Sequence, residues 1–428
     1  MSGSYWGKCD LLVVGDGPAG LTAASELFHA GYTGSRHIFD ARSDHWSRVQ
    51  TEYIDGIHYE LAAGRVHSTR HPRVSAWARG LGIGTRPFDY IPSRVNAGGS
   101  IASINHCDTY ERLSGSLAAS QPVDLCWFEY ARQSIGSEQT LQLVRDVGLD
   151  VLCNPNISAA AGCSILGGNL PETQLICVNP ALNEWCTISS GAESLLRRTR
   201  MRLRRDWQFW YSYRLQSVQA CTSGSSRYTL HFTSGNREWA VDTDAVILAM
   251  PLQDSYPACV PIANGLASVD GLVHIPLMKG VLGYEERWWE KQGLAGHCVM
   301  TSSSLRRIYF PADGPHIWFY TDSESAWRVR DGVHSQHAGQ YLHSELQKAL
   351  HTEIPTGLRP EIDWRFWENG ISFWAQGADH SDALTVEIAP GVFLCSDVLT
   401  PFNGWMEGAM MSAQAAVQKL LSNSLSDL

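Results

Sequence analysis

The sequence predicts a mixed α/β fold (α+β in part) with more than one domain, and three observations support this prediction. A chain of 428 residues is too long for one hydrophobic core and indicates two or three packed units. Residues 11–40 have the pattern of an apolar strand, a glycine-rich turn, a helix and a second strand. Strand and helix patterns of the same kind return at 190–250 and 390–428, with unlike stretches between them. The chain is therefore expected to enter one α/β domain three times.

The glycine-rich turn at residues 15–20 has the spacing of a dinucleotide-binding site. In this pattern one glycine permits the tight turn, one lets the backbone approach a pyrophosphate, and one lets helix pack on strand. The helix that begins there directs its N–H groups and the positive end of its dipole at the phosphates. Asp40 ends the second strand, twenty residues after Gly20, where a carboxylate can accept the hydroxyls of an adenosine ribose. The spacing therefore predicts dinucleotide binding.

The later segments are recognised by their periodicity. Residues 59–65 have the pattern of a strand that passes into a glycine turn, and residues 87–189 show helical spacing with few strand signals. An alternating hairpin at 211–232 precedes the apolar run 244–251, which is typical of a buried parallel strand. Residues 251–389 are rich in strand patterns and aromatic side chains, and a helix is expected over 404–421. We predict a nucleotide-binding domain from residues 7–86, 190–250 and 390–428, a helical domain from 87–189 and a sheet-rich domain from 251–389.

Composition and charge exclude several classes of protein. A formal net charge of −10 argues against nucleic-acid binding, and we interpret the arginine cluster at 197–205 as an exposed helix end. No apolar run approaches 18 residues and the first residues lack a signal-peptide core, so we expect no membrane span. Eleven scattered cysteines without a C-x-x-C pair indicate reduced thiols and a cytoplasmic protein. We expect no metal site, because the His67/His71 and His334/His337 pairs have no further ligand at useful spacing.

Five further motifs, taken in order behind the dinucleotide pattern, resemble the FAD-dependent amine oxidase superfamily. The motifs are residues 276–280, 307–310, 319–324, 395–397 and 404–408. The resemblance covers nearly the whole chain and is strongest to the bacterial L-tryptophan oxidases, such as that of the violacein pathway. It implies a Rossmann-like FAD domain assembled from three chain segments, a sheet-rich substrate-binding domain and a helical insertion.

The resemblance also implies which residues hold the FAD. Asp40 matches the carboxylate on the adenosine ribose, Arg48 matches an arginine that contacts the cofactor, and Leu215 matches a residue whose backbone meets the adenine end. Asp397 matches the acid near the ribityl chain and pyrophosphate, and Met406 begins a helix whose dipole can stabilise charge on the reduced flavin. Residues 400–404 contain no cysteine, so we expect FAD to be bound non-covalently. The full expected cofactor set is Gly15, Gly17, Ala19, Gly20, Asp40, Arg48, Arg65, Leu215, Asp397, Trp405 and Met406.

For the substrate, the resemblance implies an L-amino acid and O₂. Arg65 matches an arginine that pairs with the substrate carboxylate, a task that suits a bidentate guanidinium, and Tyr320 matches a second donor to that group. Trp405 matches an aromatic wall beside the flavin, and Lys279 matches a catalytic lysine that holds a water against flavin N5. The neutral amine would release hydride to the flavin to give an imino acid, and reoxidation by O₂ would give H₂O₂.

The sequence departs from the family pattern in three places. Trp46-Ser47 replaces a glycine pair before Arg48, and the loop at 61–64 has fewer glycines than usual. Leu149 and Asn169 align with a tyrosine and a histidine that line the tryptophan pocket in the relatives. This last departure bears on the identity of the side chain that is bound more than on the choice of an amino acid.

Other functions remain open at this point. One is a flavin monooxygenase that converts the amino acid to an amide by oxidative decarboxylation, and another is an oxidase of a simple amine, against which Arg65 argues. A third is a non-catalytic flavin-binding protein. We expect a small-molecule substrate from a natural-product pathway, with a second copy of the chain and a downstream pathway enzyme as candidate partners.

Overall fold

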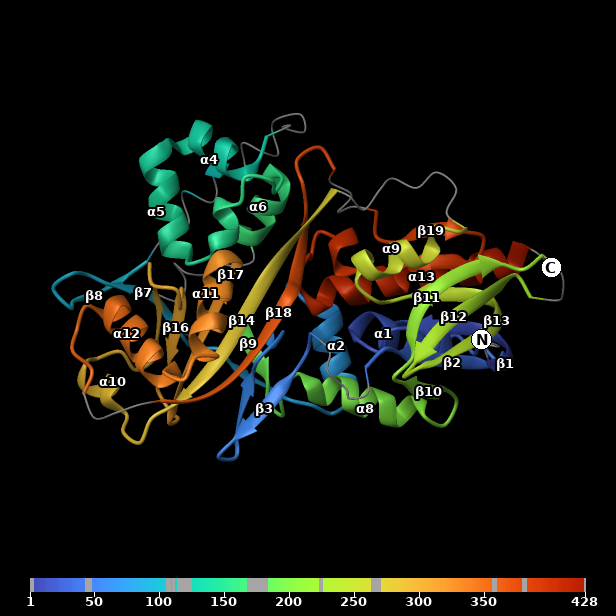
Figure 1. Ribbon diagram of the computed structural model, residues 1–428, viewed down its shortest axis with the longest axis horizontal. Helices are drawn as coiled ribbons and strands as arrows, with labels where there is room; N and C mark the ends of the chain where they lie inside the picture. Colours follow the sequence, from blue (N-terminus) through green and yellow to red (C-terminus); the bar gives the residue numbers. More distant parts are fainter. Residues whose placement is uncertain are drawn as a thin grey trace.

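A computed structural model gives a mixed α/β structure. It describes residues 4–42, 48–104, 109, 112–113, 125–167, 184–222, 226–262, 271–355, 360–378 and 383–426. Two large sheets lie at opposite ends of the long axis, and a group of helices covers one side of the second sheet (Figure 1). The predicted fold class is confirmed.

The first sheet joins the beginning, the middle and the end of the chain. Strand β1 (Ser4–Val14) pairs in parallel with β2 (Arg36–Asp40) on one side and with β13 (Arg237–Leu248) on the other. Strand β13 also pairs in parallel with β20 (Val392–Leu394), beside which β19 (Val386–Ala389) lies antiparallel. The remaining strands are β10 (Gln208–Tyr211), β11 (Arg214–Ala220) and β12 (Tyr228–Ser234). The three expected visits to one α/β sheet are therefore present.

Helices bury this sheet because its central strands are apolar on both faces. Residues Leu11 to Val14 of β1 are all buried, as a parallel strand covered on both sides requires. Helices α1 (Pro18–His29) and α13 (Met406–Ser426) pack against each other, and α8 (Glu193–Leu203) contacts α1. Helix α9 (Leu252–Cys259) lies over strand β11.

The second sheet is built around two long strands, β14 (Leu272–Gly283) and β18 (Glu361–Trp374), which pair antiparallel. Its order continues from β14 through β17 (His316–Asp322), β16 (Arg307–Phe310) and β15 (His297–Met300) to β7 (Ile91–Val95) and β8 (Ile101–Ser103). Helices α10 (Trp288–Lys291), α11 (Ser323–Val333) and α12 (Ala338–Leu350) lie at this end of the molecule (Figure 1).

The stretch 87–189 is less purely helical than its sequence pattern indicates. Its described part holds helices α4 (Trp127–Ile135), α5 (Ser137–Val147) and α6 (Ala159–Gly167) and the short 3-10 helix η1 (Asp150–Cys153). It also contributes β7 and β8, which have weak strand patterns because they are short and close one edge of the second sheet. The domain limits drawn from the sequence stay a prediction.

Two small sheets connect the large ones. Strands β3 (Thr51–Ile54) and β4 (Ile57–Glu60) form a hairpin, and β9 (Trp185–Ile188) lies between β5 (Arg65–His67) and β6 (Thr85–Pro87). Helix α2 (Pro72–Gly80) follows β5 and contacts α13. Pairing of β5 with β9 brings residues near 65 and 185 together.

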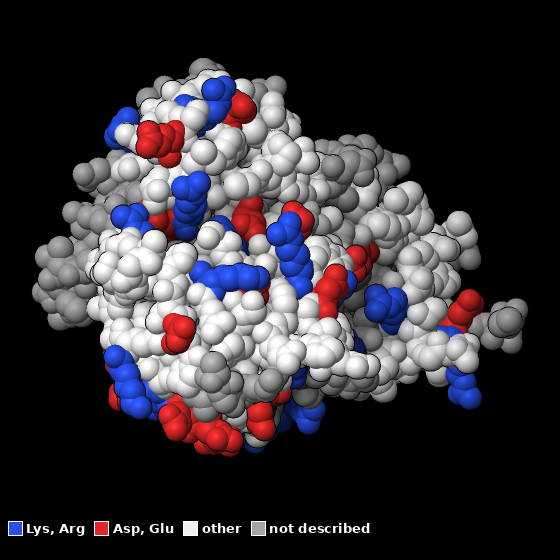
Figure 2. All heavy atoms as spheres, turned by 60° about the vertical axis from the view of Figure 1, so that its left-hand side comes forward, with Lys and Arg blue, Asp and Glu red and all other residues white. Residues whose placement is uncertain are grey.

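The surface and the described side chains fit an ordinary globular protein. Basic and acidic side chains are interspersed on the face shown in Figure 2. No helix within the described ranges is long and apolar enough to cross a membrane. Among the residues that the structure describes, no three His, Cys, Asp or Glu side chains are grouped to hold a metal ion.

Candidate active site

The glycine-rich turn after β1 has a backbone that only small residues permit. Gly15 has a φ of +106°, and a Cβ there would lie 2.6 Å from the carbonyl oxygen of Ala249. A Cβ on Gly20 would collide with the carbonyl oxygen of Gly15. The space beside Gly17 is open, as the close approach of a pyrophosphate requires. The surroundings of Gly15 and Gly20 fit the tight turn and the close packing that the spacing predicts, and the role of Gly17 at a pyrophosphate stays a prediction.

Asp40 stands beside this turn with a partner that the sequence analysis missed. Its carboxylate accepts hydrogen bonds from the backbone N–H of Asp16, at 3.0 Å, and from Arg42 Nε and Nη2, at 2.8 and 2.7 Å. Burial opposes ionisation of Asp40, but the hydrogen bonds and charge of Arg42 outweigh it and lower the pKa of Asp40. The position of Arg42, two residues after Asp40, was the feature of the sequence that could have predicted this ion pair.

The arginine cluster of α8 is exposed as expected at 197, 198, 202, 204 and 205, but not at Arg200. Arg200 is 3% exposed because its Nε donates to Asp16 Oδ2 at 2.7 Å. Burial raises the pKa of Asp16, and the charge of Arg200 opposes the shift. The expectation that the whole cluster is solvated is therefore wrong at this position, where an internal carboxylate needs a counter-charge.

A single cavity of about 570 Å³ runs from the glycine-rich turn to the second sheet. It brings together eight of the residues that the sequence singles out: Arg48, Arg65, Leu149, Lys279, Tyr320, Asp397, Trp405 and Met406. Ala19 lies in the first turn of α1, and Leu215 is buried on β11 among the residues of the first sheet. Asn169 and Trp46-Ser47 lie outside the described residues.

Lys279 lies on β14 at the centre of the cavity wall, opposite Tyr320 of β17 in the strand register. Its Nζ donates to the carbonyl oxygens of Ala62, at 2.6 Å, and Glu60, at 3.3 Å. Burial lowers the pKa of Lys279 to about 8, with Glu60 opposing the shift and Arg65 adding to it. The pKa of this lysine therefore lies well below its ordinary range, and its hydrogen bonds tie the second sheet to the loop that precedes Arg65.

The carboxyl group of Glu60 also faces this region, and the sequence analysis assigned it no role. Burial raises the pKa of Glu60 to about 7. Both of its oxygens already have donors, since Oε1 accepts from the backbone N–H of Ala192 at 2.8 Å and Oε2 accepts from Thr51 Oγ1 at 2.9 Å. Ala192 is the residue that caps α8, so Glu60 anchors the start of that helix.

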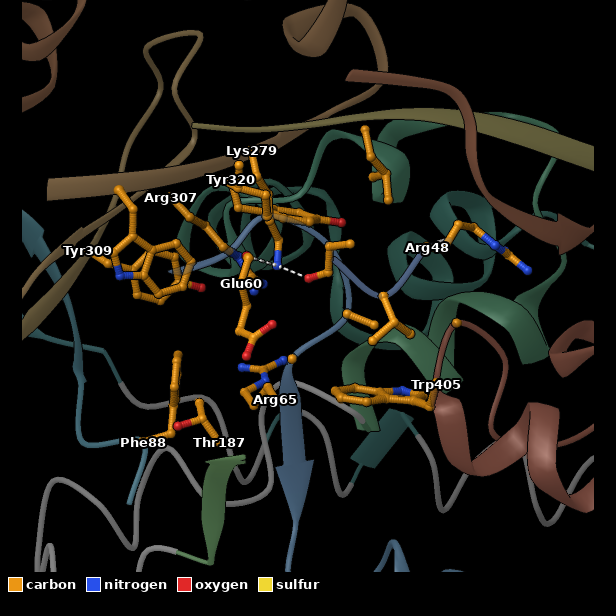
Figure 3. Close-up of a pocket in the computed structure, with 18 of the residues that line it drawn as sticks. Arg48, Glu60, Arg65, Phe88, Thr187, Lys279, Arg307, Tyr309, Tyr320 and Trp405 are labelled. Carbon is orange, nitrogen blue, oxygen red and sulfur yellow. Dashed lines mark hydrogen bonds between the residues drawn. The ribbon is translucent and has the colours of Figure 1, made fainter. Parts of the chain in front are cut away.

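Arg65 lies across the cavity from Lys279 and Tyr320 in a ring of aromatic side chains (Figure 3). Its guanidinium carbon is 4.4 Å from the ring centre of Trp185, 5.4 Å from that of Trp405 and 5.7 Å from that of Phe88. Trp185 and Trp405 are themselves stacked, with ring centres 5.2 Å apart. Trp185 was missed, because only the pairing of β5 with β9 places it here.

A second arginine lines the cavity beside Tyr320 (Figure 3). The Arg307 Nε donates to the carbonyl oxygen of Val147 at 2.8 Å, and its guanidinium lies 6.0 Å from the Tyr320 ring. In the sequence, Arg307 is distinguished only as the first residue of the motif at 307–310. Burial raises the pKa of Tyr320, so this phenol stays protonated and can donate a hydrogen bond.

The helical insertion contributes the apolar end of the cavity. Leu149 and Val151 line it at η1, together with Ile165 of α6 and Phe373 of β18. Asp322 holds η1 in place by accepting the backbone N–H of Val151 at 2.7 Å, and burial raises the pKa of Asp322 to about 6. Leu149 therefore lines the cavity, and its contact with a substrate side chain stays a prediction.

A family model for flavin-containing amine oxidoreductases matches residues 158–421. The chain belongs to that family. It is also similar in structure to wild-type putrescine oxidase bound to putrescine, with a TM-score of 0.72 at 17% identity over 98% of this chain and all of the other. A triple mutant from a redesign of cofactor binding in putrescine oxidase gives a TM-score of 0.74 at 16% identity over 97% of this chain and 99% of the other.

The residues present fit the flavin that this amine oxidoreductase family uses. The open side of Gly17 and the carboxylate of Asp40 lie at the nucleotide end, and Arg48, Asp397 and Met406 line the cavity that continues from there. Arg48 Nη2 and Asp397 Oδ1 are 3.1 Å apart, although the two residues are far apart in the sequence. The predicted flavin dependence is confirmed at the level of the family.

Proposed function

We propose that the protein is an FAD-dependent L-amino-acid oxidase that acts on L-tryptophan or a related aromatic amino acid. It converts the amino acid to the 2-imino acid and reduces O₂ to H₂O₂. The observation that carries the proposal is the placement of Arg65, Lys279 and Tyr320 around one cavity. A guanidinium enclosed by aromatic rings is suited to a carboxylate, because the pairing is strong where water is excluded.

Arg65 and Tyr320 bind and orient the substrate. Arg65 takes the carboxylate in a bidentate ion pair, and the protonated phenol of Tyr320 donates a further hydrogen bond to it. Binding energy from this end would orient the Cα–H bond for transfer and make the transfer an intramolecular event.

Lys279 holds charge and a proton near the reacting atoms. FAD, when bound, supplies the acceptor for the hydride from Cα and passes the electrons to O₂. The Nζ of Lys279 is fixed by the Ala62 and Glu60 carbonyl groups and has a proton to offer or retain near neutral pH, because its pKa lies at about 8. The Lys279 Nζ would position a water, and its positive charge would stabilise the negative charge that develops when O₂ is reduced.

The aromatic and apolar cavity lining supports a large side chain. Tyr309 and Trp318 stack face to face with ring centres 3.5 Å apart, and Phe88 and Tyr90 pack around them. With the apolar surface from Leu149 and Ile165, this lining suits an indole or phenyl ring better than a polar chain. The cavity volume is in the range of small-molecule sites.

The structural similarity to putrescine oxidase raises a diamine as the second candidate substrate. The charges around Lys279 disfavour it. Arg65, Arg86 and Arg307 line this space as cations and would repel a diamine. Both oxygens of the Glu60 carboxyl group are already occupied by donors from Ala192 and Thr51. Conversion to an amide by a decarboxylating monooxygenase would use the same substrate contacts. FAD is proposed to be non-covalent, because residues 400–404 contain no cysteine.

The first experiment is an anaerobic titration of the purified flavoprotein with L-tryptophan, L-phenylalanine, tryptamine and putrescine, followed by flavin absorbance. We expect bleaching by L-tryptophan, weaker bleaching by L-phenylalanine and none by the two amines, with H₂O₂ released when air is admitted. Amide and CO₂ in place of H₂O₂ would identify the monooxygenase. Bleaching by putrescine or tryptamine alone would contradict the proposal.

A further inference from the structure

A layer of aromatic side chains lies behind the wall that carries Arg65 and Trp405. Its members are Trp185, on β9, and His71, the residue before α2. They are only 7% and 4% exposed, and neither is among the residues that line the cavity. They can act on a ligand only through the side chains in front of them.

Trp185 is the nearest aromatic neighbour of the Arg65 guanidinium. The guanidinium carbon lies 4.4 Å from the Trp185 ring centre, more than 1 Å closer than to Phe88 in front, at 5.7 Å. A cation over an indole face is attracted to it, most strongly where water is excluded. A ring at this distance also restricts the rotamers of a long side chain, so Arg65 meets its ligand with less entropy left to lose.

His71 packs against the rings of both Trp405 and Trp185. Its ring centre is 4.8 Å from that of Trp405 and 5.8 Å from that of Trp185, and its Nδ1 accepts the backbone N–H of His67 at 3.1 Å. Burial lowers the pKa of His71 to about 3, and the charges of His67, Arg70 and Arg65 contribute to the shift. A neutral imidazole fills the space behind Trp405 without repelling the guanidinium of Arg65.

We propose that Trp185 is a positioning residue that sets the Arg65 guanidinium for carboxylate recognition, with His71 holding the Trp185–Trp405 stack in place. The inference rests on the proposed function, because it assigns Arg65 to the substrate carboxylate. It extends that function by assigning part of the selectivity for carboxylates to two residues that do not line the cavity.

The test measures binding of a ligand pair that lacks the reactive amine, so that turnover does not enter the readout. Isothermal titration calorimetry of the flavin-loaded protein is carried out with indole-3-propionate and with 3-(indol-3-yl)propan-1-ol, its alcohol analogue. The variants are Trp185→Leu, Trp185→Phe and the matched control Trp327→Leu. Trp327 also lies against an arginine, with its ring centre 4.1 Å from the Arg330 guanidinium carbon, but on α11 and away from the cavity.

We expect Trp185→Leu to weaken carboxylate binding about tenfold, as for the loss of one desolvated cation–π contact, and to change alcohol binding less than twofold. Trp185→Phe should recover most of the affinity, and Trp327→Leu should resemble the wild type. An equal loss for both ligands, or no loss for the carboxylate, would overturn the proposal. Wild-type protein that binds the carboxylate no better than the alcohol would instead overturn the role of Arg65 in the proposed function.

A second variant covers the case in which Trp185→Leu does not retain flavin. His71→Leu keeps the Trp185 side chain but removes the imidazole that packs against it. We therefore expect a smaller loss of carboxylate affinity than for Trp185→Leu, again with little change in alcohol affinity. A His71→Leu protein that keeps its flavin and full preference for the carboxylate would overturn the supporting role assigned to His71.

Discussion

The region of the glycine-rich turn and the cavity handle charge in different ways. Beside the turn, two buried carboxylates each have an arginine next to them: Asp16 is paired with Arg200 and Asp40 with Arg42. In the cavity, Lys279 is held by two backbone carbonyl groups, and its pKa falls because burial is not fully offset. At Asp40 the arginine outweighs burial and lowers the pKa, which favours the charged state, whereas at Lys279 burial outweighs the partners and favours loss of the proton. The difference shows that a structural charge can be told from a reactive one by its partners: an opposite charge in the first case, and neutral carbonyl groups in the second.

The largest expected effect tests the structural side of this comparison. Arg200→Leu removes the nearer of the two arginines beside buried Asp16 and leaves only Arg42, whose Nη2 lies 3.6 Å from Asp16 Oδ1, so it should lower the free energy of unfolding by about 3 kcal/mol. Urea denaturation followed by circular dichroism measures the change. Arg202→Leu, in the exposed part of the same helix, is the control and should change stability by less than about 0.5 kcal/mol. Equal effects would mean that Asp16 does not depend on Arg200.

The next effect lies at the substrate end. Arg65→Ala should lower kcat/KM for L-tryptophan about 30-fold to 1000-fold, from the loss of roughly 2–4 kcal/mol of carboxylate binding. The change should appear mainly in KM, with rates expressed per bound flavin because Arg65 also belongs to the expected cofactor set. Steady-state H₂O₂ production measures both parameters. A fall in kcat at unchanged KM would place Arg65 outside carboxylate recognition.

The pH dependence sharpens the contrast between fixed and titrating charges. The pKa of Lys279 is lowered from an ordinary 10.5 to about 8, so the native protein loses this proton first as pH rises. Between these values the unfolded chain binds more protons, and this group therefore makes a contribution to stability that rises with pH from 8 to 10.5. The rate of flavin reoxidation should fall as pH passes 8, and Lys279→Met should show a lower rate with no inflexion there. An unchanged inflexion in the variant would assign it to another group.

The smallest expected effect concerns the side-chain end. Leu149→Ala removes apolar lining from the cavity, so KM for L-tryptophan should rise about fivefold to tenfold, the effect of roughly 1–1.4 kcal/mol of lost burial. KM for L-alanine should stay the same, because its side chain does not reach this surface. A parallel rise for both amino acids would show that Leu149 shapes the whole cavity and not the side-chain end.

The sequence predicted best what depends on neighbours along the chain. The glycine turn and Asp40 follow from spacing within thirty residues, and their geometry agrees with that reading. The prediction that Arg65, Lys279 and Tyr320 lie at one site came from the family resemblance. No local pattern in the sequence could have given it, because Arg65 is more than 200 positions from the other two. Trp185 was missed for the same reason, because strand pairing between 65–67 and 185–188 brings it to Arg65.

The errors had physical causes as well. Strands β7 and β8 left little trace in the sequence because an edge strand of three to five residues needs few apolar side chains. Arg200 was taken for a solvated residue because its helix carries arginines on several faces, and the sequence does not show which face meets Asp16.

The order of strands in the first sheet also bears on how the protein is made. Strand β1 emerges from the ribosome early, but its neighbour β13 is completed only at Leu248, and β20 and α13 follow after residue 391. At ordinary synthesis rates β1 waits roughly 10–50 s for β13. The nascent chain therefore exposes an apolar strand with one partner missing until β13 has emerged. Chaperone protection during that interval should govern how much folded protein a cell obtains.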